Sequence, residues 1–123
     1  MTYLWIALGA VLGASARYFL SGYIAKSFAS SFPYGTLFIN ISGSLLLGFF
    51  LVLTSERMLL DARWRLLIAI GFCGSYTTFS SYAFETFALF EQGQWLLVAW
   101  NVMASNLFCL ASVLAGAALA RWL

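Results

Sequence analysis

Four long apolar stretches alternate with short polar or charged connections along this chain. They cover Leu4–Gly22, Pro33–Leu53, Leu66–Phe90 and Trp95–Ala120. A helix that spans a bilayer needs about 20 predominantly apolar residues, and each stretch is close to that length or exceeds it. The pattern therefore predicts an all-α membrane protein in which residues 1–123 form a single domain of four transmembrane helices.

The third stretch is interrupted by glycines and clustered hydroxyl groups between Gly71 and Tyr82. Backbone that leaves a helix at bilayer depth persists only where it is buried in protein or lines a polar cavity. We therefore expect the third helix to be broken near Gly74–Thr78. We also expect the break to mark the place where the protein handles a small polar or ionic ligand.

The composition excludes most soluble and catalytic classes of protein. The chain is 63% hydrophobic and 8% charged, whereas soluble domains carry about 25% charged residues. It has no histidine and no Walker-type phosphate-binding loop, and no nucleophile has a suitable base nearby, so we do not expect an enzyme. Cys73 and Cys109 both fall inside predicted spans, where we expect unpaired thiols that pack as small hydrophobic groups.

The distribution of charge predicts an orientation. Arg57, Arg63, Arg65 and Arg121 lie on the side of the termini and the second loop, whereas Lys26 lies on the other side. The positive-inside rule places the arginine-rich side in the cytoplasm. The bias is modest, so insertion in both orientations remains open.

Pairs of small residues four positions apart predict close helix packing, because they let backbones approach one another. A compact bundle of four helices has little room for a central pathway, which favours a homo-oligomer. The pairs are Gly9 with Gly13, Ser44 with Gly48, and Ala111 with Ala115.

Polar and aromatic side chains also fall on common helix faces, because residues three and four apart share a face. Such faces are consistent with interhelical hydrogen bonds of about 0.6 kcal/mol each, or with a polar track through the bundle. The faces are Thr36, Asn40 and Gly43 in the second span, with Ser44 at the margin; Phe79, Tyr82 and Thr86 in the third; and Asn101, Ser105 and Ser112 in the fourth.

The chemistry of this track favours a small anion. It contains no ring of acids or bases, which would mark a cation or anion pore. Amides and hydroxyls donate hydrogen bonds, and the edges of aromatic rings are electropositive. Carbonyl groups released near Gly74 and Thr77 are an alternative feature suited to a cation, and simple close packing at Gly71 and Gly74 is another interpretation.

Three segments resemble the Fluc/CrcB family of fluoride channels. Pro33-x-Gly-Thr-Leu-x-x-Asn40-x-x-Gly43 is similar to one family motif, and Gly71-Phe-Cys-Gly-Ser-Tyr-Thr-Thr-Phe-Ser-Ser-Tyr82 is similar to a longer and more specific one. Gly13-Ala-x-x-Arg17-Tyr in the first span also fits. The resemblance covers the whole chain, including its length and number of spans.

The resemblance implies a passive, fluoride-selective channel in the bacterial plasma (inner) membrane that exports cytoplasmic fluoride and so reduces its toxicity. It implies an antiparallel, dual-topology homodimer with two pores, surrounded by membrane lipid and without a nucleic-acid partner. It also implies a structural Na⁺ at the dimer interface.

The resemblance further implies roles for individual residues. Asn40 and Phe79 match pore residues, and Tyr82 stands where the family usually has a second phenylalanine. The other matches are Thr36 and Ser105 in the polar track, Arg17 in a vestibule, and Gly74 and Thr77 as Na⁺ ligands through their backbone carbonyls.

Two other functions are alternatives to the channel. A small exporter of cationic drugs needs a membrane-embedded carboxylate for proton exchange, and Glu85 is the candidate. A non-transporting assembly subunit would carry no ion flux.

Overall fold

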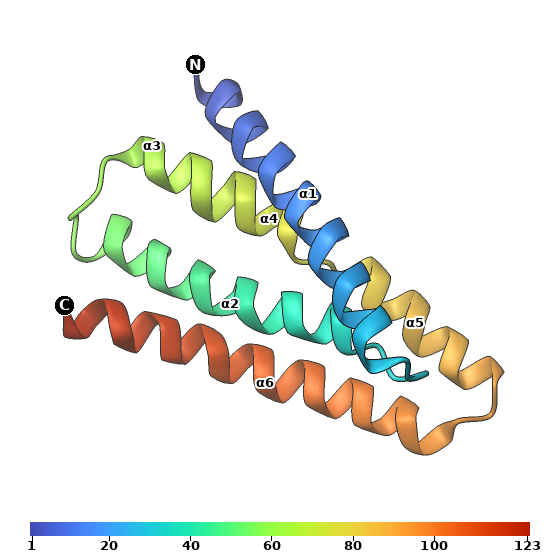
Figure 1. The fold of residues 1–123 in the computed structure, drawn as a ribbon. Coiled ribbons are helices and arrows are strands. Elements are labelled where there is room, and N and C mark those ends of the chain that lie inside the picture. Colours follow the sequence, from blue (N-terminus) through green and yellow to red (C-terminus); the bar gives the residue numbers. More distant parts are fainter.

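A computed structural model describes all residues, 1–123, and every regular element in it is helical. Three uninterrupted helices are long and apolar enough to cross a membrane: α1 (Thr2–Phe28), α2 (Tyr34–Ser55) and α6 (Trp95–Trp122). A fourth, interrupted helical segment follows α2 and precedes α6 along the chain (Figure 1). The expectation of an all-α, multi-pass membrane protein is confirmed.

The interrupted segment contains four short elements. They are α3 (Ala62–Trp64), the π-helix η1 (Arg65–Cys73), α4 (Gly74–Tyr76) and α5 (Phe79–Glu91). The break itself consists of Thr77 and Thr78, whose backbones are extended, with φ/ψ of −85°/156° and −151°/120°. The predicted break is confirmed but is narrower than expected, because Gly74 keeps helical dihedrals of −61° and −30°.

Helix ends differ slightly from the sequence-based boundaries. The first helix continues past Gly22 to Phe28 and ends at Ala29, whose φ of 43° is left-handed. Lys26 lies in its last turn, where a positive charge favours a helix C-terminus. Pro33 stands immediately before α2 rather than in its first turn.

Glycines allow helices α1 and η1, and helices α2 and α6, to meet at the backbone. A Cβ atom at Gly9 or Gly13 would collide with the backbone of η1, at Leu67 and Phe72. In the same way Gly48 faces the backbone of α6 and Gly116 faces the backbone of α2. These contacts confirm the packing roles expected of Gly9, Gly13 and Gly48, whereas Ser44 lines a cavity instead.

Ala111 and Ala115 do not pack closely against another helix of the single chain, where both are exposed. Gly116, the next residue along α6, makes the close contact instead. Lack of a Cβ atom, rather than the four-residue spacing, therefore identifies the contact face of this helix.

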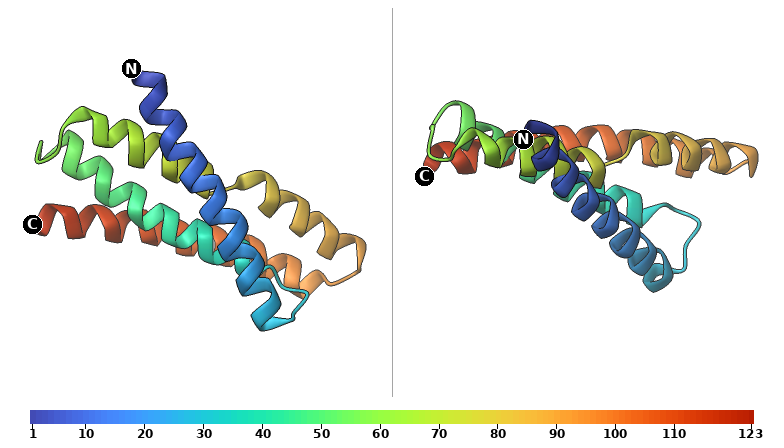
Figure 2. Two further views of the ribbon diagram at one scale, coloured as in Figure 1. Left: turned by 45° about the horizontal axis from the view of Figure 1, so that its top comes forward. Right: turned by 90° about the horizontal axis from the view of Figure 1, so that it is seen from above.

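Helices α2 and α6 run side by side, and α1 crosses the chain near the break (Figures 1 and 2). The C-terminus lies beside the turn that follows α2. There the Arg121 guanidinium donates to both carboxylate oxygens of Glu56, at 2.8 and 2.7 Å. This arrangement places the break between α1, α2 and α6, where the candidate site is found.

Candidate functional site

The Asn40 side chain supplies the hydrogen bonds that the break removes from the backbone. The Thr78 N–H donates to Asn40 Oδ1 at 2.8 Å, and Asn40 Nδ2 donates to the Thr78 carbonyl at 3.0 Å. The backbone N–H can only donate, so it fixes which end of the amide faces it. Nδ2 carries two protons, and one of them therefore remains for another acceptor.

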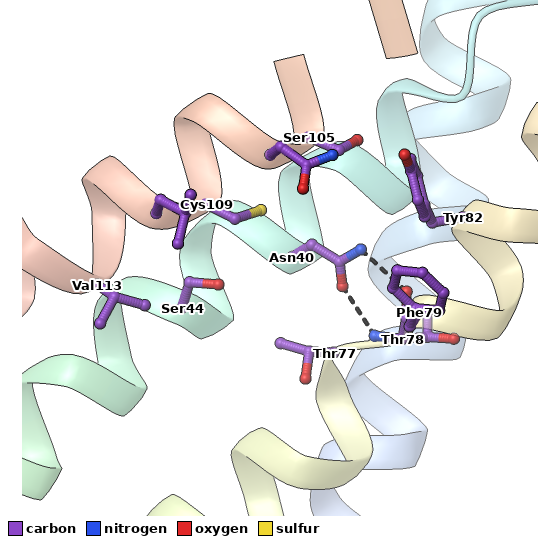
Figure 3. Close-up of a pocket in the computed structure, with 11 residues that line it drawn as sticks. Asn40, Ser44, Thr77, Thr78, Phe79, Tyr82, Ser105, Cys109 and Val113 are labelled. Atoms are coloured by element: carbon purple, nitrogen blue, oxygen red, sulfur yellow. Dashed lines mark hydrogen bonds between the residues drawn. The ribbon is translucent and has the colours of Figure 1, made fainter. Parts of the chain in front are cut away.

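A cavity of about 350 Å³, here called the Asn40 cavity, lies beside this hydrogen-bonded pair. Figure 3 shows the Asn40 amide and Thr78 on one side of it, with side chains of α6 opposite. Five predicted site residues line it: Asn40, Thr77, Phe79, Tyr82 and Ser105. The structure therefore brings together residues from α2, the break, α5 and α6.

Two aromatic rings from α5 form part of the wall of the Asn40 cavity. The ring centroids of Phe79 and Tyr82 are 5.3 Å apart, and their planes meet at 57°. Tilted pairs of this kind are common because the electropositive edge of one ring approaches the face of another. Phe79 is 78% exposed, so most of its ring remains available to an ion or to another chain.

A second cavity, of about 590 Å³, is here called the Arg17 cavity. Arg17, Thr36 and Glu85 line it, and the Thr36 hydroxyl donates to Glu85 Oε1 at 2.7 Å. Glu85 Oε2 is buried without a hydrogen-bond partner. Thr78 lines both cavities and is the one residue that they share.

The predicted site residues thus divide into two groups on either side of Thr78. Arg17 and Thr36 line the Arg17 cavity. The residues that line the Asn40 cavity are Asn40, Thr77, Phe79, Tyr82 and Ser105. Gly74 lines neither cavity. Ser112, which shares a predicted face with Ser105, also lines neither.

Four polar residues of the Asn40 cavity were not predicted as site residues. They are Thr78, Asn106, Cys109 and Ser44, which the sequence placed only at the margin of the polar face. Helical spacing carries a usable signal for two of them, because Ser44 follows Asn40 by four residues and Cys109 follows Ser105 by four. No comparable signal marks Asn106.

Comparison with known proteins identifies the family. Residues 4–117 match the family described as CrcB-like protein, Camphor Resistance (CrcB). The chain belongs to the CrcB family. A CrcB relative from Koribacter versatilis (strain Ellin345) is 61% identical over 119 residues, which are 97% of this chain and 94% of the relative.

Two further relatives are similar over nearly their whole length. One, from Rhodospirillum rubrum, is 48% identical over 118 residues, covering 94% of this chain and 92% of the relative. The other, from Sulfurihydrogenibium sp. (strain YO3AOP1), is 44% identical over 121 residues, which are 98% of each chain. All three relatives are named fluoride-specific ion channel FluC. The resemblance to the CrcB family stated from the sequence is therefore confirmed.

Proposed function

We propose that this chain is a passive, fluoride-selective channel and not an enzyme. The names of its relatives support the choice of ion. The orientation of the Asn40 amide is the observation that carries the proposal. Its Nδ2 keeps one proton free beside a cavity that also contains a ring edge and hydroxyl groups.

Such a donor set suits a small anion. Hydrogen bonds from neutral donors to a charged partner contribute about 1.5–3 kcal/mol each. Asn40, Ser105 and the edge of Phe79 can therefore replace parts of a hydration shell without a fixed opposite charge that would trap the ion. We assign Arg17 to a vestibule that attracts anions, with Thr36 between it and the Asn40 cavity.

Passive conduction is sufficient for export. Hydrogen fluoride crosses membranes as a neutral acid and ionises in a near-neutral cytoplasm. A membrane potential that is negative inside then drives the anion outward by about 2.3 kcal/mol per 100 mV. The channel thereby lowers the toxicity of fluoride in the cytoplasm.

A second copy of the chain completes the pathway in this proposal. Phe79 and Gly74 are exposed on the single chain, although they flank a break at bilayer depth. We assign this face to an antiparallel homodimer with two pores. The modest charge bias between the two sides of the membrane is compatible with insertion in both orientations.

The break also fits a structural Na⁺ at the dimer interface. The Thr77 N–H bonds to the Cys73 carbonyl and the Thr78 N–H bonds to Asn40, so neither of these N–H groups is paired with the Gly74 carbonyl. Thr77 has left the helix, so its carbonyl is also turned out of the helical ladder. Carbonyl oxygens are suitable ligands for Na⁺, and the matching carbonyls of a second copy would complete the shell.

Anion efflux from liposomes tests the channel function. Purified protein is reconstituted into vesicles loaded with potassium fluoride, a potassium ionophore removes the opposing potential, and a fluoride electrode follows release. Rapid fluoride release, with none of chloride in matched vesicles, is expected. Absence of fluoride release from well-folded protein would refute the proposal. Transport that depends on a proton gradient and is lost in Glu85→Gln would instead favour a proton-coupled exporter.

Substitution of Gly74 tests the dimer and the Na⁺ site. A Cβ atom at Gly74 meets nothing within 4 Å in the single chain, and its φ of −61° suits alanine. We expect Gly74→Ala to fold but to dimerise more weakly in sodium, because the added methyl group occupies the shared face. Unchanged dimerisation of Gly74→Ala, measured in sodium and in N-methylglucamine buffers, would contradict both assignments.

A further inference from the structure

The Ser105 hydroxyl at the Asn40 cavity makes a long hydrogen bond to a side chain, whereas most helical hydroxyls bond to their own backbone and Thr36 donates to Glu85 at 2.7 Å. Six Ser and Thr hydroxyls donate to the backbone carbonyl four residues earlier, at 2.6–2.9 Å: those of Ser21, Ser27, Ser42, Thr54, Thr77 and Thr86. Ser105 instead donates to a side chain, Asn101 Oδ1, at 3.4 Å. Hydroxyl hydrogen bonds are usually about 2.7–2.8 Å long, so Ser105 is held more weakly than the six.

The direction of the hydrogen bond between Ser105 and Asn101 follows from the contacts at the other end of the Asn101 amide. The Tyr82 carbonyl can only accept, and the Thr86 hydroxyl donates to it at 2.7 Å. The Thr86 oxygen is then free to accept, and Asn101 Nδ2 donates to it at 2.8 Å. The carbonyl end of the Asn101 amide consequently faces Ser105.

Burial keeps the Asn101 amide in this orientation. Asn101 is 1% exposed, so water does not compete for its polar atoms. A buried amide has a strong preference for the orientation that satisfies its donors. The series of hydrogen bonds from Tyr82 to Ser105 therefore links α5 to α6 through the side chains of Thr86 and Asn101, which line neither cavity.

We infer that Asn101 is a positioning residue for anion recognition, which keeps the Ser105 hydroxyl as a weakly engaged donor at the Asn40 cavity. This inference rests on the proposed function. A weakly held hydroxyl can turn toward an anion at little cost. Without Asn101 Oδ1, Ser105 is expected to donate to the backbone carbonyl of residue 101, as the six other hydroxyls do in their helices, and to be released less readily.

A double-mutant cycle on fluoride efflux tests this assignment. Vesicles carry about one channel each, so that misfolding lowers the fraction of fluoride released, whereas altered recognition lowers the rate of release per active vesicle. Loss of a hydrogen bond to a charged partner predicts that Ser105→Ala slows this rate by about tenfold or more. We expect Asn101→Leu to slow it in the same way, and the double variant to match Ser105→Ala alone.

Thr54→Val is the matched control, because the Thr54 hydroxyl is back-bonded in α2 and lines neither cavity. It should leave the rate unchanged. If Asn101→Leu does not fold, Thr86→Val replaces it, since this change removes the acceptor that orients the amide. Its effect on the rate should likewise disappear in the Ser105→Ala background.

Two results would overturn the inference while leaving the channel function intact. One is a wild-type rate in Asn101→Leu or in its substitute, Thr86→Val. The other is a double variant whose rate loss equals the product of the two single losses, since this result would mean that the two residues act independently. If wild-type protein releases no fluoride at all, the proposed function and this inference both fail.

Discussion

Replacement of Asn40 by alanine is expected to destabilise the fold as well as to reduce fluoride flux. The change removes the partners of two Thr78 backbone groups at once, and Thr78 is buried. Each buried group left without a partner costs about 1–3 kcal/mol, so the unfolding free energy should fall by about 2–6 kcal/mol. The lost Nδ2 donor should slow fluoride release by at least about tenfold as well.

A matched variant separates this effect from the general loss of an amide. Asn106 lines the same cavity, but it is exposed and its Nδ2 donates to the Val102 carbonyl within its own helix, at 2.8 Å. Asn106→Ala should change the unfolding free energy by no more than about 0.5 kcal/mol. Titration with sodium dodecyl sulfate measures both variants. Equal unfolding midpoints for Asn40→Ala and Asn106→Ala would refute the structural role given to Asn40.

Asn40→Asp separates folding from recognition. A carboxylate still accepts the Thr78 N–H, so part of the hydrogen bonding at the break is kept. Its second oxygen cannot donate to the Thr78 carbonyl, and its charge repels an anion. We expect a smaller loss of stability than in Asn40→Ala but an equal or greater loss of fluoride efflux, and efflux at the wild-type rate would contradict the role of the amide proton.

Three further variants test other parts of the site. Phe79→Ile removes a ring edge from the Asn40 cavity and should abolish fluoride release. Phe84→Ile is the control, because Phe84 is an exposed ring of the same helix that lines neither cavity, and it should leave release unchanged. Equal release rates for the two variants would refute the role of the Phe79 ring. A small methanethiosulfonate reagent should reach Cys109 in the cavity and block efflux, while the buried Cys73 stays unmodified; block that persists in Cys109→Ser would contradict this. The hydrogen bond from the Arg121 guanidinium lowers the pKa of Glu56. The stabilisation from this contact is therefore present above the ordinary pKa of a glutamate and is lost as the pH falls through the lowered pKa. Hydrogen exchange in the last turn of α6 should rise at acid pH, and no rise relative to Glu56→Gln would refute the contact.

The sequence predicted the spans well because apolar length alone determines them. The break was also predictable, since Gly71 and the hydroxyl cluster are unsuited to an ordinary span. Its position was less certain, because glycine permits a break without requiring one. Gly74 remains helical, and the backbone departs only where Asn40 offers replacement hydrogen bonds to Thr78.

The site was predictable in part. Asn40, Phe79 and Ser105 line one cavity as the shared faces and the family resemblance suggested. The separation into two cavities on either side of Thr78 was not predictable, because it depends on how α1 crosses the bundle. Helical periodicity within single spans has no information on such a crossing.

Asn40 has both a structural and a recognition role, and this limits how the selectivity of the protein can be redesigned. Its amide lines the cavity and also holds the backbone at the break, so a replacement that changes ion recognition also costs stability, to a degree that depends on the new side chain. Ser105, Asn106 and Cys109 line the same cavity from α6 without supporting the break. Libraries intended to admit a larger anion should therefore vary these α6 positions first and keep Asn40 constant.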